Sequence, residues 1–159
     1  MAVLFSHVTN SSNHMKLKNN EPCPACGRFA NRGVTIDALI LRKDKILLIK
    51  RAAEPFKGFW ALPGGYVEWD ETTEEAVQRE VEEEVGLSVT SLKFIGLYSN
   101  PKRHPKQCID LAYAVETEGE VKAGDDAADY EWKSIQNLPD LALDHRHIID
   151  DYLKSCAIN

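Results

Sequence analysis

Four glutamates fall within five residues of the stretch REVEEEVGL, which covers residues 79–87. No lysine stands four residues after any of them, and like charges at that spacing destabilise an isolated helix by about 0.2–0.5 kcal/mol per pair. On a helix Glu80, Glu83 and Glu84 share one face, where their carboxylates can converge on a hard divalent cation such as Mg²⁺. Such a cation would turn the repulsion into attraction and would also bridge to a phosphate. The alternative is a solvated acidic face, which is the usual role of a charge run.

The residues around this run favour cation binding. Gly64 and Gly65 come shortly before the helix, and glycine lets the backbone approach a ligand closely. Glu71 in the connecting loop and Arg79 on the helix carry opposite charges, so an ion pair between them would pin the loop onto the helix. Glu82 points away from the other three glutamates, and we expect it to be solvated.

The acidic run lies on a helix with clear start and stop signals. Thr72 and Glu75 have the spacing of a capping box at its start. Gly86 is suited to the C-terminal cap. The apolar stripe that faces the core recurs every four residues, at Val77, Val81 and Val85.

The rest of the chain predicts a sheet and a second helix. Residues 51–59 contain Pro55 and Gly58 and are typical of a loop. The last helix is predicted over residues 145–156. Apolar runs bounded by polar turns predict strands at residues 34–41, 46–49, 88–98, 108–116 and 131–135. Strands interspersed with helices indicate a mixed α/β fold with helices packed on a sheet.

Composition limits the function classes. A length of 159 residues suits one domain with a single core, and no apolar run approaches the roughly 20 residues that span a bilayer. The net charge of −6 argues against binding to nucleic acid through bulk electrostatics. Four cysteines in an undistinguished pattern do not form a disulfide framework, so we expect a reduced, cytoplasmic setting. We predict a small-molecule partner, no nucleic acid and no membrane.

The N-terminal residues form a segment of their own. We predict a partly disordered tail over residues 1–32 and a folded domain over residues 33–159. Cys23 and Cys26 have the spacing of half a zinc ribbon, whereas a structural zinc ion takes four ligands. Only Cys108 and Cys156 remain as thiols, without a second pair at that spacing, so we do not expect zinc at Cys23 and Cys26.

The stretch GYVEWDETTEEAVQREVEEEVGL, residues 65–87, resembles the signature of the Nudix hydrolases at every specified position. The likeness in element order extends over residues 33–155. This resemblance implies a Nudix α/β/α sandwich, with a mixed sheet between helices and a loop-helix-loop motif. It also implies substrates in which a nucleoside diphosphate is linked to another moiety. The residues that it implies as ligands of Mg²⁺, or of Mn²⁺, are Glu80, Glu83, Glu84 and the carbonyl of Gly64. Glu71 and Arg79 would hold the loop.

A later acidic loop resembles that of ADP-ribose pyrophosphatases, where such a loop often supplies the general base. It reads AGDDAADYEW over residues 123–132. Asp126 is the first choice for the base or an extra ligand, followed by Asp125 and then Asp129. With Glu83 and Glu84, Asp126 completes the predicted catalytic set. The alternative is an ordinary acidic loop before a strand.

Candidate substrate contacts lie before and after residues 65–87, the stretch that resembles the Nudix signature and is called the box below. Residues 98–106, YSNPKRHPK, resemble a segment common in ADP-ribose pyrophosphatases, but His104 replaces an aspartate and Lys106 replaces an arginine. Arg103 and Lys106 are candidates for binding phosphate, and Arg51 for phosphate or ribose. Phe56 is a candidate for stacking on adenine. The alternative for the three cations is solvated surface charge. We assign no role to the histidines at positions 145 and 147.

The resemblance implies a magnesium-dependent pyrophosphatase that converts ADP-ribose to AMP and ribose 5-phosphate. Alternatives within the class are hydrolysis of nucleoside triphosphates, NADH or dinucleoside polyphosphates. An alternative of another kind is a non-catalytic Nudix domain that senses a nucleotide. By analogy with the pyrophosphatases that this chain resembles, a homodimer is also an expectation.

Overall fold

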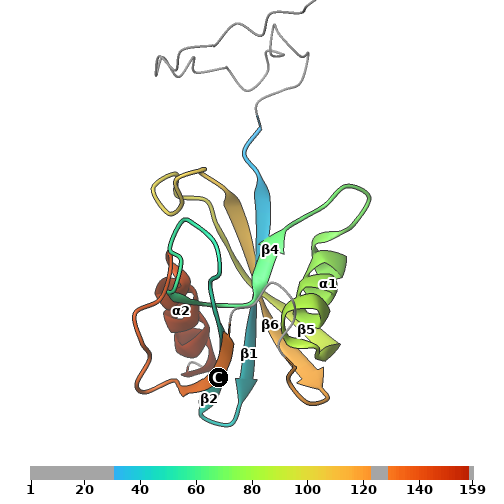
Figure 1. The fold of residues 1–159 in the computed structure, drawn as a ribbon, viewed down its shortest axis with the longest axis vertical. Helices are drawn as coiled ribbons and strands as arrows, with labels where there is room; N and C mark the ends of the chain where they lie inside the picture. The colour runs from blue at the N-terminus through green and yellow to red at the C-terminus, as the bar shows by residue number, and fades with distance from the viewer. Residues whose placement is uncertain (1–30, 123–128, 158–159) are drawn as a thin grey trace, which may run out of the picture. The chain divides into compact units, whose positions relative to one another are not determined.

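The structure is a computed structural model that describes residues 31–122 and 129–157 (Figure 1). The chain divides between Asn31 and Arg32, and all of the described helices and strands belong to the second unit. Residues 1–30 of the predicted tail, with Cys23 and Cys26, lie outside the described residues. Arg32, which the sequence prediction places in the tail, belongs to the second unit and donates to the carbonyl of Ser99 over 2.8 Å.

The described strands form one seven-stranded mixed sheet in the order β3-β2-β1-β6-β5, with β4 paired to β1 and β7 paired to β2. Strand β1 runs parallel to β6 and antiparallel to β2 and β4. The strands are β1 (Val34–Arg42), β2 (Lys45–Lys50), β3 (Trp60–Ala61), β4 (Gly64–Tyr66), β5 (Ser88–Tyr98), β6 (Ile109–Glu118) and β7 (Asp129–Ser134).

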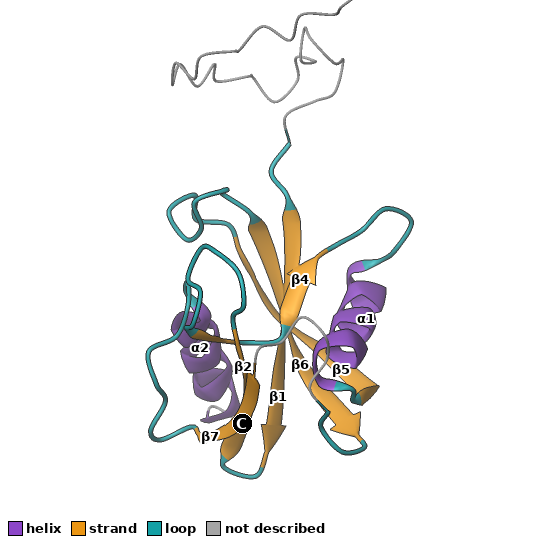
Figure 2. Cartoon of the chain, in the orientation of Figure 1, coloured by secondary structure: helices purple, strands orange, loops and turns teal. Residues whose placement is uncertain are grey.

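The two described helices lie on opposite faces of this sheet, as Figures 1 and 2 show. They are α1 (Thr73–Val85) and α2 (His145–Ala157). In β1, Ile36 and Ile40 join the core under α1, whereas Leu39 joins the core under α2. Successive side chains of a strand point to opposite faces, so one continuous apolar run serves both cores. The predicted α/β/α sandwich is confirmed.

Helix α1 has the caps that the sequence predicts. The Thr72 side chain accepts a hydrogen bond from the Glu75 N–H, and the Glu75 carboxylate accepts one from the Thr72 N–H. At the other end Gly86 adopts the left-handed conformation, with φ 65°, and donates its N–H to the carbonyl of Glu82. The predicted stripe is fully buried, at Val77, Val81 and Val85.

The short strands β3 and β4 go beyond the sequence prediction, which places only an apolar piece and a glycine pair there. Elements of two and three residues show no periodicity, so they are defined only by pairing with longer strands. In β4, Gly64 lies opposite Asp37 of β1, and Gly65 lies opposite Ile36. This pairing fixes the glycine pair against the centre of the sheet.

The loop between β4 and α1 carries the most exposed large apolar side chain of the described residues, Trp69, at 96%. Figure 1 shows this loop extending away from the sheet before it returns to the helix. Neither described helix is long and apolar enough to cross a membrane.

Candidate active site

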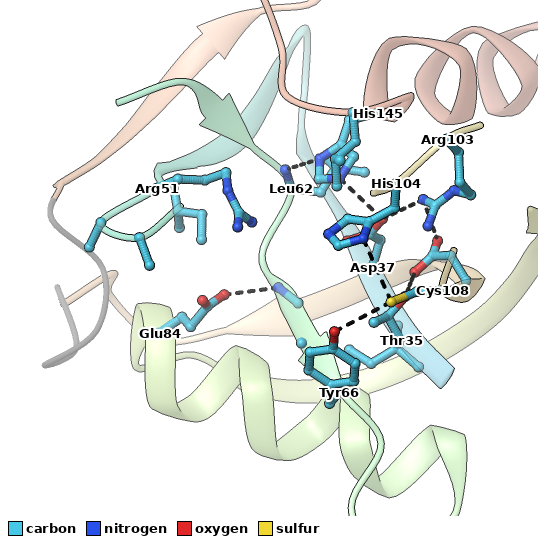
Figure 3. Close-up of a pocket in the computed structure, with 18 of the residues that line it drawn as sticks. Thr35, Asp37, Arg51, Leu62, Tyr66, Glu84, Arg103, His104, Cys108 and His145 are labelled. Carbon is cyan, nitrogen blue, oxygen red and sulfur yellow. Dashed lines mark hydrogen bonds and ion pairs between the residues drawn. The ribbon is translucent and has the colours of Figure 1, made fainter. Parts of the chain in front are cut away.

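A cavity of about 300 Å³ lies beside the glycine pair of β4 (Figure 3). Its walls come from β1, the end of β2, β4, the end of α1, the segment that leads into β6 and the turn into α2. Residues that are far apart in the sequence therefore meet here. The polar side chains of its lining include Arg51, Glu84, Arg103, His104 and His145.

The glycine pair brings the backbone against two glutamates of α1. The Gly64 N–H donates to Glu84 Oε2 over 2.9 Å. A Cβ atom on Gly65 would collide with the carboxylate of Glu80, and one on Gly64 would collide with the carbonyl oxygen of Ile36. The backbone contact leaves no room for a side chain at Gly64, whereas a side chain at Gly65 would displace the Glu80 carboxylate. Glu80 and Glu84, one helical turn apart, therefore lie against consecutive residues of β4.

Arg79 binds the loop and two glutamates of the box together. Its Nε and Nη2 atoms donate to the Glu71 carboxylate over 3.1 and 2.8 Å. Its Nη2 also donates to the Tyr66 carbonyl over 3.0 Å. Its Nη1 donates to Glu80 over 2.9 Å and to Glu83 over 3.2 Å. The ion pair that the sequence predicts between Arg79 and Glu71 is therefore present, and the hydrogen bonds from Arg79 lower the pKa of Glu71.

The donors beside the glycine pair suit a hard divalent cation, because carboxylate and carbonyl oxygens are the ligands that Mg²⁺ prefers. Burial raises the pKa of Glu80, although Arg79 acts in the opposite direction, so a nearby cation would stabilise the charged form. Among the described residues no three acidic, histidine or cysteine side chains are grouped closely enough to hold a metal ion, and Arg79 Nη1 bridges Glu80 and Glu83. These oxygen donors are of the kind that Mg²⁺ prefers. Ligation of the cation by Glu80, Glu83, Glu84 and the Gly64 carbonyl stays a prediction.

Arg103 lies at the opposite wall within a buried ionic network. Its side chain is 3% exposed, and its Nη2 lies 2.7 Å from Asp144 Oδ1. The same atom lies 3.6 Å from Asp110 Oδ2 and 3.8 Å from Asp37 Oδ2. The alternative of a solvated surface charge is therefore wrong for Arg103. A direct contact with substrate stays a prediction for this residue, whose charge is already balanced inside the protein.

Two of these carboxyl groups titrate far from their ordinary range. Burial raises the pKa of Asp37 to about 7, and burial together with the neighbouring Asp37 charge raises that of Asp110 to about 9. The raised pKa favours the protonated form of Asp110 at neutral pH, and in this form the carboxyl can donate a hydrogen bond to Asp37. Thr35 Oγ1 donates to Asp110 Oδ1 over 2.8 Å. One guanidinium cannot balance two buried carboxylates together with the half-buried Asp144, and a retained proton relieves that excess.

His145, at the start of α2, is 2% exposed and lines the same cavity. Its Nδ1 accepts the backbone N–H of Leu62 over 2.8 Å, and its Nε2 lies 3.4 Å from Asp37 Oδ2 (Figure 3). Burial lowers the pKa of His145 to about 4, so the ring is neutral near neutral pH. The sequence interpretation, which assigns this histidine no role, does not anticipate its place in the cavity wall.

Arg51, Lys106 and Phe56, which the sequence predicts as substrate contacts, do not line one common cavity. Arg51 lines the cavity, and its Nε donates to the carbonyl of Pro55 over 3.0 Å. Lys106 is exposed, with Nζ 5.7 Å from the centre of the Tyr66 ring, and it is not among the residues that line the cavity. Phe56 is half-buried against the core under α1 and lines a separate hollow. These binding roles stay predictions.

Asp126, the first choice for the general base, lies outside the described residues, and so does Asp125, the second choice. Asp129, the third choice, begins β7 and is exposed. The structure therefore leaves all three assignments as predictions.

Sequence reasoning missed the buried polar residues of the cavity wall. Asp37 and Asp110 interrupt the apolar runs VTIDALIL and CIDLAYAV, where a charged residue must find partners inside the protein. That interruption was an available signal. No comparable signal marks His145, because a histidine at a helix start is usually a cap or surface residue.

The comparisons with known proteins extend over most of the described residues. The NUDIX domain model matches residues 31–152. An ADP-ribose pyrophosphatase of Methanocaldococcus jannaschii is 47% identical over 128 residues, which cover 79% of this chain and 76% of that protein. The NAD-capped RNA hydrolase NudC of Pseudomonas aeruginosa is 33% identical over 154 residues and covers 91% of this chain, which spans about half (54%) of that relative.

A solved structure of a bifunctional NMN adenylyltransferase/ADP ribose pyrophosphatase of Francisella tularensis, complexed with AMP and a manganese ion, superposes with a TM-score of 0.70. The identity is 33%, and the match covers 80% of this chain and 43% of that one. The matched family model and the 47% identical relative both extend over most of the chain, and the family model includes the glutamates of α1 and the residues that line the cavity. The chain belongs to the NUDIX domain family.

Proposed function

We propose that this protein hydrolyses the diphosphate bond of ADP-ribose in the presence of Mg²⁺ or Mn²⁺ and releases AMP and ribose 5-phosphate. The observation that carries the proposal is the placement of Glu80 and Glu84 against the glycine pair, beside a cavity large enough for part of a nucleotide. The 47% identical ADP-ribose pyrophosphatase supports the substrate. The Francisella structure is complexed with AMP and a manganese ion, which supports a nucleotide and a divalent cation as ligands.

Glu80, Glu83, Glu84 and the Gly64 carbonyl would hold the cation, which when bound supplies charge neutralisation and a more acidic water. Glu83 is the most accessible of the carboxylates that contact Arg79, with a side chain 61% exposed. An exposed ion pair of this kind contributes about 0–1 kcal/mol, so Glu83 can turn from Arg79 toward a cation at small cost. Arg79 would then still be held by Glu71 and Glu80.

The positive side of the cavity suits a diphosphate. Figure 3 shows the Arg51 guanidinium turned toward the cavity. The His104 Nδ1 accepts the Lys106 N–H over 2.9 Å, so in the neutral ring Nε2 carries the hydrogen and can donate to a phosphate or hydroxyl oxygen. Burial, followed by the positive charges of Arg103, Lys106 and Arg51, lowers the pKa of His104 and favours this neutral form.

The test is turnover of a substrate panel with Mg²⁺, comparing the wild type with Glu84→Gln. We expect ADP-ribose to be the best substrate, ahead of NADH and dGTP, and Glu84→Gln to lower kcat by about a hundredfold. Glu82→Gln is the matched control, because Glu82 is exposed on the same helix. Full activity of Glu84→Gln, or a preference for dGTP, would contradict the proposal.

The general base is proposed to be Asp126, with Asp125 and Asp129 as the alternatives. Asp126→Asn should lower kcat strongly and shift the acid limb of the pH–rate profile, because a base must be deprotonated to accept a proton. An unchanged kcat would remove Asp126 from the mechanism.

A second candidate substrate is the NAD cap of RNA, or NADH itself. The observation that favours it is the 33% identity to the Pseudomonas NudC, which extends over 154 residues. The net charge of −6 disfavours extended contacts to an RNA backbone. Including NAD-capped RNA in the panel separates the two, and binding of ADP-ribose without turnover of any substrate would instead indicate a sensor.

A further inference from the structure

The backbone that leads into the glycine pair is held by hydrogen bonds at alternate residues. The Trp60 carbonyl accepts the Ala142 N–H over 2.8 Å, and the Gly64 N–H donates to Glu84 over 2.9 Å. Between them the Leu62 N–H donates to a side chain, the Nδ1 atom of His145. Leu62 is 2% exposed, so without this acceptor its N–H would be buried without a partner. A buried donor without an acceptor is strongly disfavoured.

The position of His145 follows from the path of the chain beside β3. Leu141 forms an isolated parallel bridge with Trp60, so the segment begins as a short extension of the sheet. The chain then turns at Leu143, which has a φ of 54°, and enters α2 at His145. Since the chain leaves the sheet there, the imidazole ring takes the place of a backbone acceptor. The left-handed conformation of Leu143 is strained for a leucine and persists only where the surrounding contacts fix it.

The second ring nitrogen reaches the other neighbour of the glycine pair. Because Nδ1 accepts a hydrogen bond, the neutral ring carries its hydrogen on Nε2. That atom lies 3.4 Å from Oδ2 of Asp37, the residue opposite Gly64 in the β1–β4 pairing. A single ring therefore contacts the backbone two residues before Gly64 and the side chain across from it.

We propose that His145 is a positioning residue, which fixes the Leu62–Gly64 backbone so that Gly64 stays against Glu84 in the arrangement that receives the divalent cation. This inference rests on the proposed function, because it concerns the same cation site. It assigns His145 no contact with substrate or with the reacting atoms. Its effect passes through the hydrogen bond to Leu62.

Two substitutions separate this role from simple packing. Asn places its side-chain oxygen near the position of Nδ1, whereas Gln places its polar atoms near Nε2. His145→Asn should therefore keep the acceptor for Leu62, and His145→Gln should lose it. His147→Gln is the control, because His147 is exposed on the same helix.

The first readout is amide hydrogen exchange at Leu62, together with Mn²⁺ affinity from the paramagnetic resonance signal of the free ion. In His145→Gln we expect Leu62 exchange about tenfold faster and Mn²⁺ affinity about tenfold weaker, the loss of one buried hydrogen bond. kcat should fall by a similar factor at saturating substrate, with KM within about twofold. His145→Asn should remain within about threefold of wild type in every readout.

Equal losses in the Asn and Gln variants would overturn the proposal, as would a lower Tm with unchanged Leu62 exchange and Mn²⁺ affinity. The ¹⁵N shifts of the His145 ring in the wild type provide a test that needs no variant: they should report hydrogen on Nε2, and hydrogen on Nδ1 would refute the assignment. If the wild type turns over no nucleotide, the proposed function fails, whereas the exchange and Mn²⁺ measurements still decide the role of His145.

Discussion

At the scale of single residues, the carboxyl group of Asp110 in the cavity wall has a pKa raised well above its ordinary value. Asp110 is 1% exposed and shares its surroundings with Asp37 and Arg103. The folded state holds the Asp110 proton up to a pKa of about 9, whereas an unfolded chain would release it near its ordinary value of 3.8. Between these values the folded state binds more protons than the unfolded state, so its stability falls as pH rises.

Asp110→Asn should remove this part of the pH dependence, because an amide imitates the protonated acid and still donates to Asp37. Between pH 6 and 8 the free energy of unfolding of the wild type should fall relative to that of the variant by about 1 kcal/mol per pH unit. Urea denaturation at each pH measures the difference. Asp140→Asn, at an exposed position, should run parallel to the wild type. Parallel curves for Asp110→Asn would mean that Asp110 is ionised in the folded protein.

At the scale of elements, α1 has to present acidic side chains to β4 in spite of their mutual repulsion. The helix has no basic residue in its last turn, and its first turn carries Glu74 and Glu75. The N-terminal end is therefore stabilised by the Thr72 capping box and by these acidic side chains, whereas the C-terminal end relies on Gly86 in the left-handed conformation. The buried valine stripe then fixes the rotation of the helix, which directs Glu80 and Glu84 toward the glycine pair.

Thr72→Ala should lower the free energy of unfolding by about 1 kcal/mol, because the side chain that accepts the Glu75 N–H is lost. Chemical denaturation measures this loss. The exposed Gln78 on the same helix provides the comparison, and Gln78→Ala should stay within about 0.5 kcal/mol of wild type. If both variants were equally stable, the capping box would not contribute to the helix in solution.

At the scale of the whole molecule, Arg103 connects segments that are distant in the chain. It comes from the loop between β5 and β6, and its carboxylate partners come from β1, β6 and the residue before α2. A buried guanidinium of this kind contributes little net stability while it is paired, but its removal leaves carboxylates without compensation.

Arg103→Met should therefore destabilise the protein by about 3–5 kcal/mol. The loss should be smaller at low pH, where the carboxyl groups left without the Arg103 charge are protonated and neutral. Thermal and urea unfolding both measure it. Lys102→Met changes an exposed neighbour and should have a small effect. A small effect of Arg103→Met at neutral pH would show that Asp37 and Asp144 take up protons in its place.

Prediction from the sequence succeeded where local signals decide the structure. The caps at Thr72 and Gly86 and the valine stripe act within one helix, and the sequence gives their positions directly. The cavity wall depends instead on the meeting of β1, β6 and the turn into α2, which no local pattern encodes. His145 is the clearest case, because its acceptor role depends on where the chain leaves β3. The loop with Asp126 lies outside the described residues, so its role stays a prediction.

The exposed indole of Trp69 supplies a built-in optical reporter for the segment that leads to Glu71. Of the three tryptophans, Trp60 and Trp132 are half-buried beneath basic side chains, whereas Trp69 is in contact with water. A difference spectrum between the wild type and Trp69→Phe isolates its emission. A nucleotide or cation that draws this loop toward the cavity would shift that emission to the blue, and titration of the shift would follow occupancy without any label.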